Sequence, residues 1–270
     1  MFLIKEFILF LLHIFKSRKL IYNLIVYDFK KNYLGSYLGL AWAFIQPLSF
    51  VLIIWVVFGL GFRAQPTTSG APFVIWLLAG MVPWFFFSGA ISSGSTAITG
   101  NAYLIRKIFF RISILPLVKI GSSFLIHLGL LIFLVVALLL NGFWPTIYWL
   151  QLPFYGALTI FFVIGLSWFT GSVHVFVKDV SSIIGILIQM GFWLTPIFWS
   201  LDLVPVKFHY LIKLNPAYFI VDGYRDSLIS QIWFWEKPTW TIYYLAISSI
   251  TLIFGALVFQ RLRPHFADVL

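Results

Sequence analysis

Few residues of this sequence have a type and spacing that could carry out catalysis. There is no cysteine, and the five histidines are scattered, so that none forms an i, i+4 pair with another metal ligand. Ser92, Ser93 and Ser95 surround Gly94 in a run that resembles a serine-protease loop only loosely, and no G-x-S-x-G motif is present. Such a run is more typical of small residues that let membrane helices pack closely. We therefore expect no catalytic site and no metal site.

Ion-driven transport and nucleotide hydrolysis also lack their usual residues. A carrier driven by protons or ions usually has an ionisable residue inside the membrane, but Asp179 falls beside Lys178 at the edge of an apolar stretch. Gly35 and Gly39 have the spacing of a helix-contact motif, and no Gly-Lys-Ser/Thr ending follows that would make a phosphate-binding loop. Any energy from ATP must therefore come from another polypeptide.

The composition is that of an integral membrane protein. Of the 270 residues, 61% are hydrophobic and 10% are charged, and the mean hydropathy is +1.01, whereas a soluble domain carries roughly 25% charged residues. The net charge of +10 does not indicate a nucleic-acid partner, because the basic residues separate apolar runs and form no hydrophilic face. We expect one transmembrane domain over residues 1–270 and no nucleic acid.

The apolar stretches predict the number of membrane crossings. About 20 apolar residues are needed to cross the hydrocarbon core, and six segments are long enough. They are residues 34–62, 72–98, 120–140, 152–177, 180–199 and 240–259, and none has Asp, Glu, Lys or Arg in its interior. The sequence therefore predicts an all-α polytopic fold with six transmembrane helices.

Two further segments predict helices at the membrane surfaces. Residues 2–16 are apolar but short and precede a basic cluster, which favours a helix lying in the interface; a helix packed on the first span is the alternative. Residues 200–239 are too long and too apolar for a structureless loop. Because Asn215-Pro216 is a typical helix start, we expect two short helices that dip into the outer face, the second beginning near Pro216.

The basic residues predict the orientation. If the N-terminus is cytoplasmic, 13 of the 18 basic residues fall on the inner side and 5 on the outer side, as the positive-inside rule requires. Aromatic residues at the proposed outer boundaries fit an interfacial belt: Tyr148, Trp149, Trp199, Trp233, Trp235 and Trp240. Both termini are therefore expected in the cytoplasm.

Aromatic residues make up 20% of the chain. Contact with lipid explains most of the 31 phenylalanines, but flat rings also suit a sliding carbohydrate, because sugar C–H faces stack on them without a fixed register. The dense clusters, which we take as candidates for a polysaccharide pathway, are Trp42, Trp84, Phe85, Phe86, Phe87, Phe192 and Trp193.

Several motifs together resemble one family. The run DFKKNYLGSYLGLAW from Asp28 to Trp42, followed by Pro47, resembles the start of the first span of ABC-2 type polysaccharide exporter permeases, and AGMVPWFFF at 79–87 resembles their second-span signature. The remaining matches are Asn101 with residues 104–107 and Pro116, residues 177–179 where the family often carries Arg-Asp, residues 193–197, and Asn215-Pro216 with Tyr224 and Arg225. Each motif is weak, but six in family order are specific and cover nearly the whole chain.

The resemblance implies a transport subunit rather than an enzyme. It implies a homodimer bound to two copies of a separate ATPase that holds ATP and Mg, with no cofactor on this chain. The cargo would be an undecaprenyl-linked polysaccharide (O antigen, capsule or teichoic acid) crossing a bacterial cytoplasmic (inner) membrane among membrane lipids. The interfacial helix and residues 99–116 would contact the ATPase. Arg106, Lys107 and Arg111 are then coupling residues, or else plain inside-positive charges.

The resemblance also suggests a mechanism. Closure of the ATPases would open the dimer seam between the first and fifth spans, and the helices of 200–239 would form an outer gate. Asn215, Tyr224 and Arg225 would hold the fold of this gate or meet lipid phosphate, which suits the bidentate guanidinium. Two other functions stay open: a small-lipid or drug efflux permease of the same superfamily, which favours a narrow dry seam, and a membrane-embedded enzyme of polysaccharide assembly.

Overall fold

The computed structural model describes residues 17–33, 37–63, 70–102 and 112–270, and within these ranges the chain forms helices and turns but no strand. The all-α prediction is thereby confirmed. The predicted interfacial helix at 2–16 and the three candidate coupling residues lie outside the described residues.

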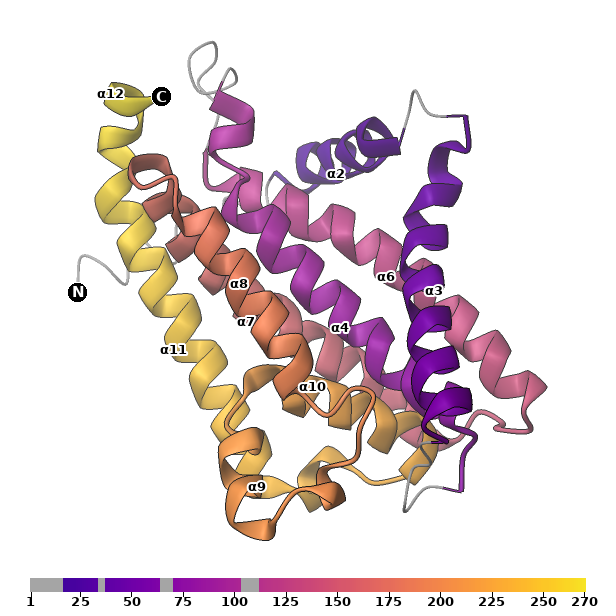
Figure 1. Ribbon diagram of the computed structural model, residues 1–270. Helices are drawn as coiled ribbons and strands as arrows, with labels where there is room; N and C mark the ends of the chain where they lie inside the picture. The colour runs from indigo at the N-terminus through magenta and orange to yellow at the C-terminus, as the bar shows by residue number, and fades with distance from the viewer. Residues whose placement is uncertain (1–16, 34–36, 64–69, 103–111) are drawn as a thin grey trace.

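Most of the helices run side by side along the long axis of the molecule (Figure 1). In chain order, the helices are α2 (Arg18–Tyr33), η1 (Gly39–Ala41), α3 (Trp42–Ile54), η2 (Trp55–Gly61), α4 (Phe73–Ser95), η3 (Thr99–Asn101), α6 (Ile114–Leu140), η4 (Ile147–Gln151), α7 (Leu152–Phe176), α8 (Val180–Leu194), η5 (Leu201–Leu203), α9 (Val206–Lys213), α10 (Pro216–Arg225), η6 (Asp226–Ser230), η7 (Phe234–Glu236), α11 (Pro238–Leu262), η8 (Arg263–His265) and α12 (Phe266–Val269).

Five helical segments of the described chain are long and apolar enough to cross a membrane. They are Gly39–Gly61, Phe73–Ser95, Ile114–Leu140, Ile147–Phe176 and Pro238–Val269. The fifth predicted span is shorter than expected, because α8 has 15 residues and ends at Leu194. The prediction of a helix as far as Trp199 is wrong, since Thr195 precedes Pro196 and is extended (φ −86°, ψ 134°), as a residue before proline prefers.

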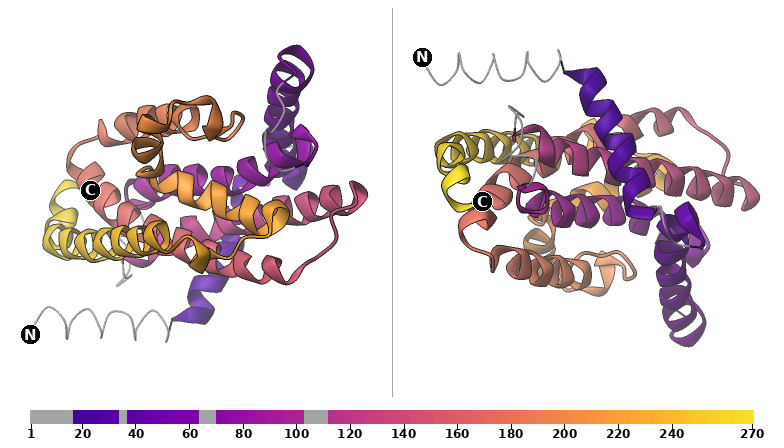
Figure 2. Two further views of the ribbon diagram at one scale, coloured as in Figure 1. Left: turned by 90° about the horizontal axis from the view of Figure 1, so that it is seen from below. Right: turned by 90° about the horizontal axis from the view of Figure 1, so that it is seen from above.

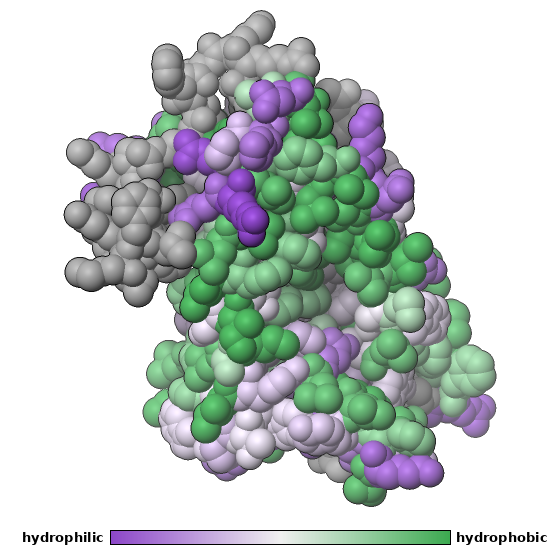
Figure 3. Space-filling model, turned by 90° about the vertical axis from the view of Figure 1, so that its left-hand side faces the viewer, coloured by the Kyte–Doolittle hydropathy of each residue, from purple (hydrophilic) through white to green (hydrophobic). Residues whose placement is uncertain are grey.

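The two ends of the bundle differ in character. The end where α3 and α8 begin, here the basic end, carries Arg18, Lys19, Lys30, Lys31, Lys119, Lys178, Arg261 and Arg263. The opposite end, here the hairpin end, is formed by the helices of 200–239 and lies at the bottom of Figure 1. On the face drawn in Figure 3, hydrophobic side chains cover much of the middle, and hydrophilic side chains gather toward the upper and lower ends. This distribution is that of a membrane-spanning bundle.

Helix α2 crosses α6 at the basic end instead of joining the bundle (Figures 1 and 2). Asp28 of α2 accepts a hydrogen bond from Lys119 of α6 at 2.5 Å, with the Asp28 side chain only 12% exposed. Ile25 lies directly over Gly121, where a Cβ atom would overlap its side chain. The sequence predicted an interfacial helix at 2–16 but no helix over residues 18–33, because the hydrophobic residues of that segment show little amphipathic periodicity.

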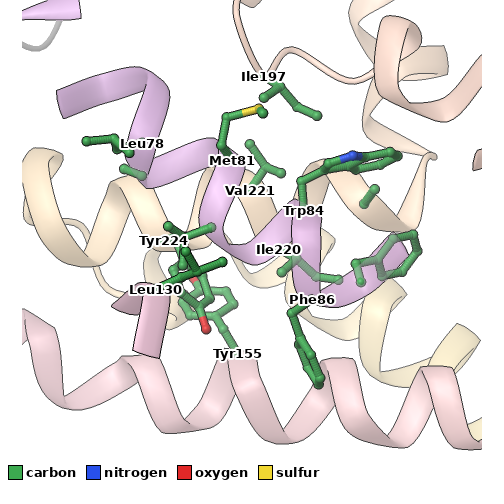
Figure 4. Packing of buried hydrophobic residues seen from close by; sticks show 14 of the residues in the cluster. Leu78, Met81, Trp84, Phe86, Leu130, Tyr155, Ile197, Ile220, Val221 and Tyr224 are labelled. Atoms are coloured by element: carbon green, nitrogen blue, oxygen red, sulfur yellow. The ribbon is translucent and has the colours of Figure 1, made fainter. Parts of the chain in front are cut away.

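Helix α4 is the centre of the bundle, whereas α3 stands at its edge. In the most apolar stretch of each segment, 72% of the residues of Phe73–Ser95 are buried, against 17% for Gly39–Gly61. Helices α6, α7, α8 and α10 all pack against α4, and Figure 4 shows side chains of α4 packed among those of α6, α7 and α10. Helix α3 therefore leaves much of its apolar surface free for lipid or another protein chain.

Candidate functional site

An open groove of about 460 Å³ lies along α3, with Phe85 of α4 on its other side. Its lining is Trp42, Ile45, Gln46, Pro47, Ser49, Phe50, Ile53 and Phe85. The α3 residues recur at intervals of three and four, so they share one face of the helix. The lining is mostly apolar, with the side chains of Gln46 and Ser49 as polar groups, and Trp42 is 46% exposed.

Aromatic rings meet where Phe50 and Phe85 line this groove. The Phe50 ring lies 6.4 Å from that of Phe85 and 5.4 Å from that of Phe192 on α8, and Trp84 lies 5.8 Å from Phe192. Further along, Phe58 of η2 meets Phe198 at 4.7 Å. These rings, here called the aromatic cluster, join α3, α4 and α8. Ring pairs of this kind contribute about 0.5–1.5 kcal/mol each beyond the area that they bury.

Five of the seven predicted pathway aromatics lie at the groove or at the aromatic cluster. Trp42 and Phe85 line the groove, and Trp84 and Phe192 belong to the aromatic cluster. Trp193 stays 54% exposed beside the cluster, with its ring edge-on to those of Phe192 and Phe198.

Phe86 and Phe87 face the interior of the bundle instead. Phe86 packs on Phe124 and His127 of α6, and Phe87 stacks on Phe162 of α7 with ring centroids 5.8 Å apart. Figure 4 shows Trp84 and Phe86 pointing away from different sides of α4. Four consecutive residues of a helix face all sides of it, so the run 84–87 could not line one pathway. The sequence analysis missed Phe50, although its spacing of eight residues from Trp42 places both on one face.

Arg225 fixes helix α10 to two neighbouring segments. The side chain is buried, and its guanidinium donates to the carbonyls of Pro196 and Ile197 at 2.6 Å each and to that of Trp76 at 3.3 Å. It also lies over the Trp76 ring, 3.4 Å from the centroid. Gly80 gives it room, since a Cβ there would lie 2.6 Å from Nη2. Of the two predicted roles for Arg225, this geometry favours holding the fold over binding lipid phosphate.

The other two predicted gate residues also hold α10 in place. The carboxamide oxygen of Asn215 accepts from the backbone N–H of Ala217 at 3.0 Å, which caps the helix as predicted. Its Nδ2 donates to Thr195 Oγ1 at 2.8 Å, just beyond the end of α8. The Tyr224 hydroxyl lies 2.9 Å from His127 Nε2 on α6, and both side chains are buried. Helix α10 is thus tied to α4, to α6 and to the segment after α8.

An ion triad connects the same helix to the start of α11. Lys237 Nζ lies 2.8 Å from Asp222 Oδ2 and 2.5 Å from Asp226 Oδ2. Burial raises the pKa of Asp226, and the charge of Asp222 raises it further, while Lys237 acts in the opposite direction. Burial lowers the pKa of Lys237, but the two carboxylates outweigh it and the resulting shift is upward. The ammonium group therefore stays charged between its two partners.

Comparison with known proteins identifies the family. A family model described as ABC-2 type transporter matches residues 19–229. The chain belongs to this family. It is 27% identical over 244 residues to the O-antigen export system permease protein RfbA of Klebsiella pneumoniae. The aligned residues make up 90% of this chain and 92% of that relative. RfbA of Myxococcus xanthus is 24% identical over 260 residues, 94% of this chain and 96% of that protein.

A more distant relative is named for the transport of a different polysaccharide. The polysialic acid transport protein KpsM of Escherichia coli is 23% identical over 230 residues, which covers 84% of this chain and 87% of KpsM. The similarity of this ABC-2 family member therefore runs over nearly the full length of relatives named for O-antigen or polysialic acid transport.

Proposed function

We propose that this chain is the membrane-spanning permease subunit of an ATP-driven exporter that moves a lipid-linked polysaccharide across the cytoplasmic membrane, with O antigen as the cargo. The observation that carries the proposal is the match to O-antigen export permeases over 90% or more of the chain. The groove along α3 supports the proposal, since the C–H faces of sugars can stack on its exposed aromatic rings. In this role the chain is a transport subunit and not an enzyme, and a partner ATPase holds ATP and Mg.

In this proposal the basic end faces the cytoplasm and the hairpin end faces outward. The excess of basic residues at one end supports this orientation, with both termini inside. Helix α8 and the residues that follow it would complete a sixth crossing. At about 1.5 Å per residue, its 15 residues span roughly 22 Å, so the segment from Thr195 and the helices α9 and α10 would lie partly within the outer leaflet.

The groove would form half of the pathway, and a second copy of the chain would supply the other half. Helices α3 and α8 support this arrangement, because both expose apolar side chains, Leu52 and Ile53 on α3 and Ile186 and Leu187 on α8. In the dimer the aromatic cluster would act as the outer barrier that separates when the ATPases close. An undecaprenyl-linked cargo would keep its lipid at the protein surface and its glycan along the rings.

Coupling to two ATPase subunits would occur at the basic end. The position of α2 supports a role in this, since the Asp28–Lys119 ion pair connects it directly to the first turns of α6. Residues 99–116, with Arg106, Lys107 and Arg111, lead into the same helix, which begins at Ile114. Movement of either segment would therefore reach α6, whose His127 bonds to Tyr224 on the outer helix.

The proposed function is tested by deleting the gene in its host. We expect the surface polysaccharide to disappear and lipid-linked polymer to accumulate in the cytoplasm, because polymerisation continues without export. Antibody labelling of intact and of permeabilised cells measures the two pools. The matched comparison is complementation with the wild-type gene and with a variant in which Arg106, Lys107 and Arg111 are all Gln, which should insert into the membrane but export poorly.

Two outcomes would contradict the proposal. Normal surface polysaccharide with altered efflux of dyes or small lipids would indicate the small-molecule permease instead. Loss of polymer from both pools would indicate an enzyme of polysaccharide assembly, because such a protein acts before export. Full export by the triple Gln variant would remove the coupling role and leave those residues as topology signals.

A further inference from the structure

A second cavity lies at the hairpin end, between α10 and the first turn of α11. Its volume is about 300 Å³, at the lower end of the range of roughly 300–1,000 Å³ for small-molecule sites. The ring of Trp240 and the side chain of Tyr218 form apolar parts of its wall. The charged groups at this cavity, here called the outer pocket, are Asp222, Asp226, Glu236, Lys213 and Lys237.

The polar groups of the outer pocket keep hydrogen-bonding capacity after their internal contacts are counted. The two bonds of Lys237 use two of its three ammonium hydrogens. The carboxylates of Asp222 and Asp226 accept these bonds through Oδ2, and Asp222 also accepts a hydrogen bond from the Tyr218 side chain. Glu236 accepts from the backbone N–H of Trp233 through Oε1. A bound molecule would therefore meet free acceptors and free donors beside an aromatic wall.

The balance of charges selects the chemical class of the ligand. Three carboxylates and two ammonium groups line the same small space. An anion such as a phosphate would be repelled by the three carboxylates. A cation could reach Asp222 and Asp226 only by displacing Lys237, which is already paired with both of them. A neutral polyhydroxylated ring satisfies both kinds of group, since each hydroxyl both donates and accepts.

We propose that the outer pocket binds one neutral sugar unit of the exported glycan, with the sugar's C–H face on Trp240 and its hydroxyls on Asp222, Glu236 and Lys237. The assignment of this sugar to the exported polymer rests on the function proposed above. The pocket is large enough for a single ring and not for a chain, so it would hold one unit at the exit while the remainder of the polymer moves.

The proposal is tested by saturation-transfer NMR on the protein in lipid nanodiscs free of sugar-based detergent. The probes are glucose, galactose, mannose and N-acetylglucosamine, with glucose-1-phosphate and glucosamine as charged comparators. We expect at least one neutral sugar to bind and its charged analogue to bind more weakly. Thr239→Trp fills the pocket from an exposed position on its wall, and Trp240→Leu removes the ring; each should weaken binding by about tenfold or more, or about 1.4 kcal/mol.

Trp235→Leu is the control, because Trp235 is an exposed tryptophan at the same end that stacks on Trp233 and does not line the pocket. Absence of binding by every neutral sugar would overturn the proposal, as would binding that Thr239→Trp leaves unchanged. Export by cells carrying each variant is measured in parallel. Slower export by Thr239→Trp supports the assignment to the polymer, and an unchanged rate contradicts it. Wild-type export tests the proposed function separately.

Discussion

Arg225→Leu is expected to abolish export and to lower the thermal stability of the protein. The substitution removes three hydrogen bonds and leaves the carbonyls of Trp76, Pro196 and Ile197 without their buried donor. Each orphaned buried group costs about 1–3 kcal/mol, or about 3–9 kcal/mol for three. We expect a loss in the lower part of that range, about 3–5 kcal/mol, which is the usual cost of breaking a buried charged pair. Thermal unfolding of the purified protein, followed by fluorescence-detected size exclusion, measures the loss.

Two comparisons make this experiment specific. Arg225→Lys keeps the charge but not the planar fork that reaches two carbonyls at once, so it should recover only part of the stability and of export. Lys207→Leu removes an exposed positive charge from the same end of the molecule and should leave stability unchanged. Wild-type stability in Arg225→Leu would show that helix α10 is not held by this residue.

Gly255→Leu is expected to separate α7 from α11 and to prevent stable accumulation of the protein. A Cβ at Gly255 would overlap the backbone carbonyl of Gly165, and a Cβ at Gly165 would lie 2.5 Å from Leu252 Cα. Backbone atoms of a helix have no other position to take, so the helices must move apart along a buried contact. Overpacking of a well-packed core costs about 1–3 kcal/mol of stability. We expect a loss at the upper end of this range, because the obstructing atoms belong to the backbone.

A glycine on the facing helix provides the control. A Cβ at Gly156 of α7 would have no heavy atom within 4 Å, and alanine is favoured over glycine inside a helix by about 1 kcal/mol. Gly156→Ala should therefore leave the melting temperature unchanged or raise it slightly, whereas Gly255→Ala should already lower it. Equal melting temperatures for the two alanine variants would contradict close backbone packing between α7 and α11.

The sequence predicted the features that depend on local pattern. Apolar stretches showed where the long helices lie, and Asn215-Pro216 correctly marked the start of α10 with its side-chain cap. The end of α8 was misplaced by five residues, because Trp199 continues the apolar run while the conformation changes at Thr195. Hydropathy records composition, and here the backbone restriction before Pro196 decided the helix end.

Contacts between distant segments could not be read from the sequence. Arg225 donates to Trp76, which lies 149 positions earlier, and no local pattern marks that pair. The run 84–87 was assigned to one pathway because its residues are alike, yet the helical rotation of about 100° per residue sends Phe87 to α7 and Phe85 to the groove. The outer pocket also depends on distant contact, since Lys213, Asp222 and Lys237 meet there through the fold of three short segments.

Photo-crosslinking during export tests most directly whether polysaccharide passes along the groove on α3. A benzophenone amino acid is placed at Phe50, which lies in the groove and is 40% exposed, or at Phe254 of α11, which is 52% exposed. Helix α11 lies on the side of the bundle away from α3 (Figure 2). We predict that position 50 crosslinks to the glycan when the complete exporter hydrolyses ATP and that position 254 does not. Glycan captured equally at both positions, or only at position 254, would contradict passage along the groove.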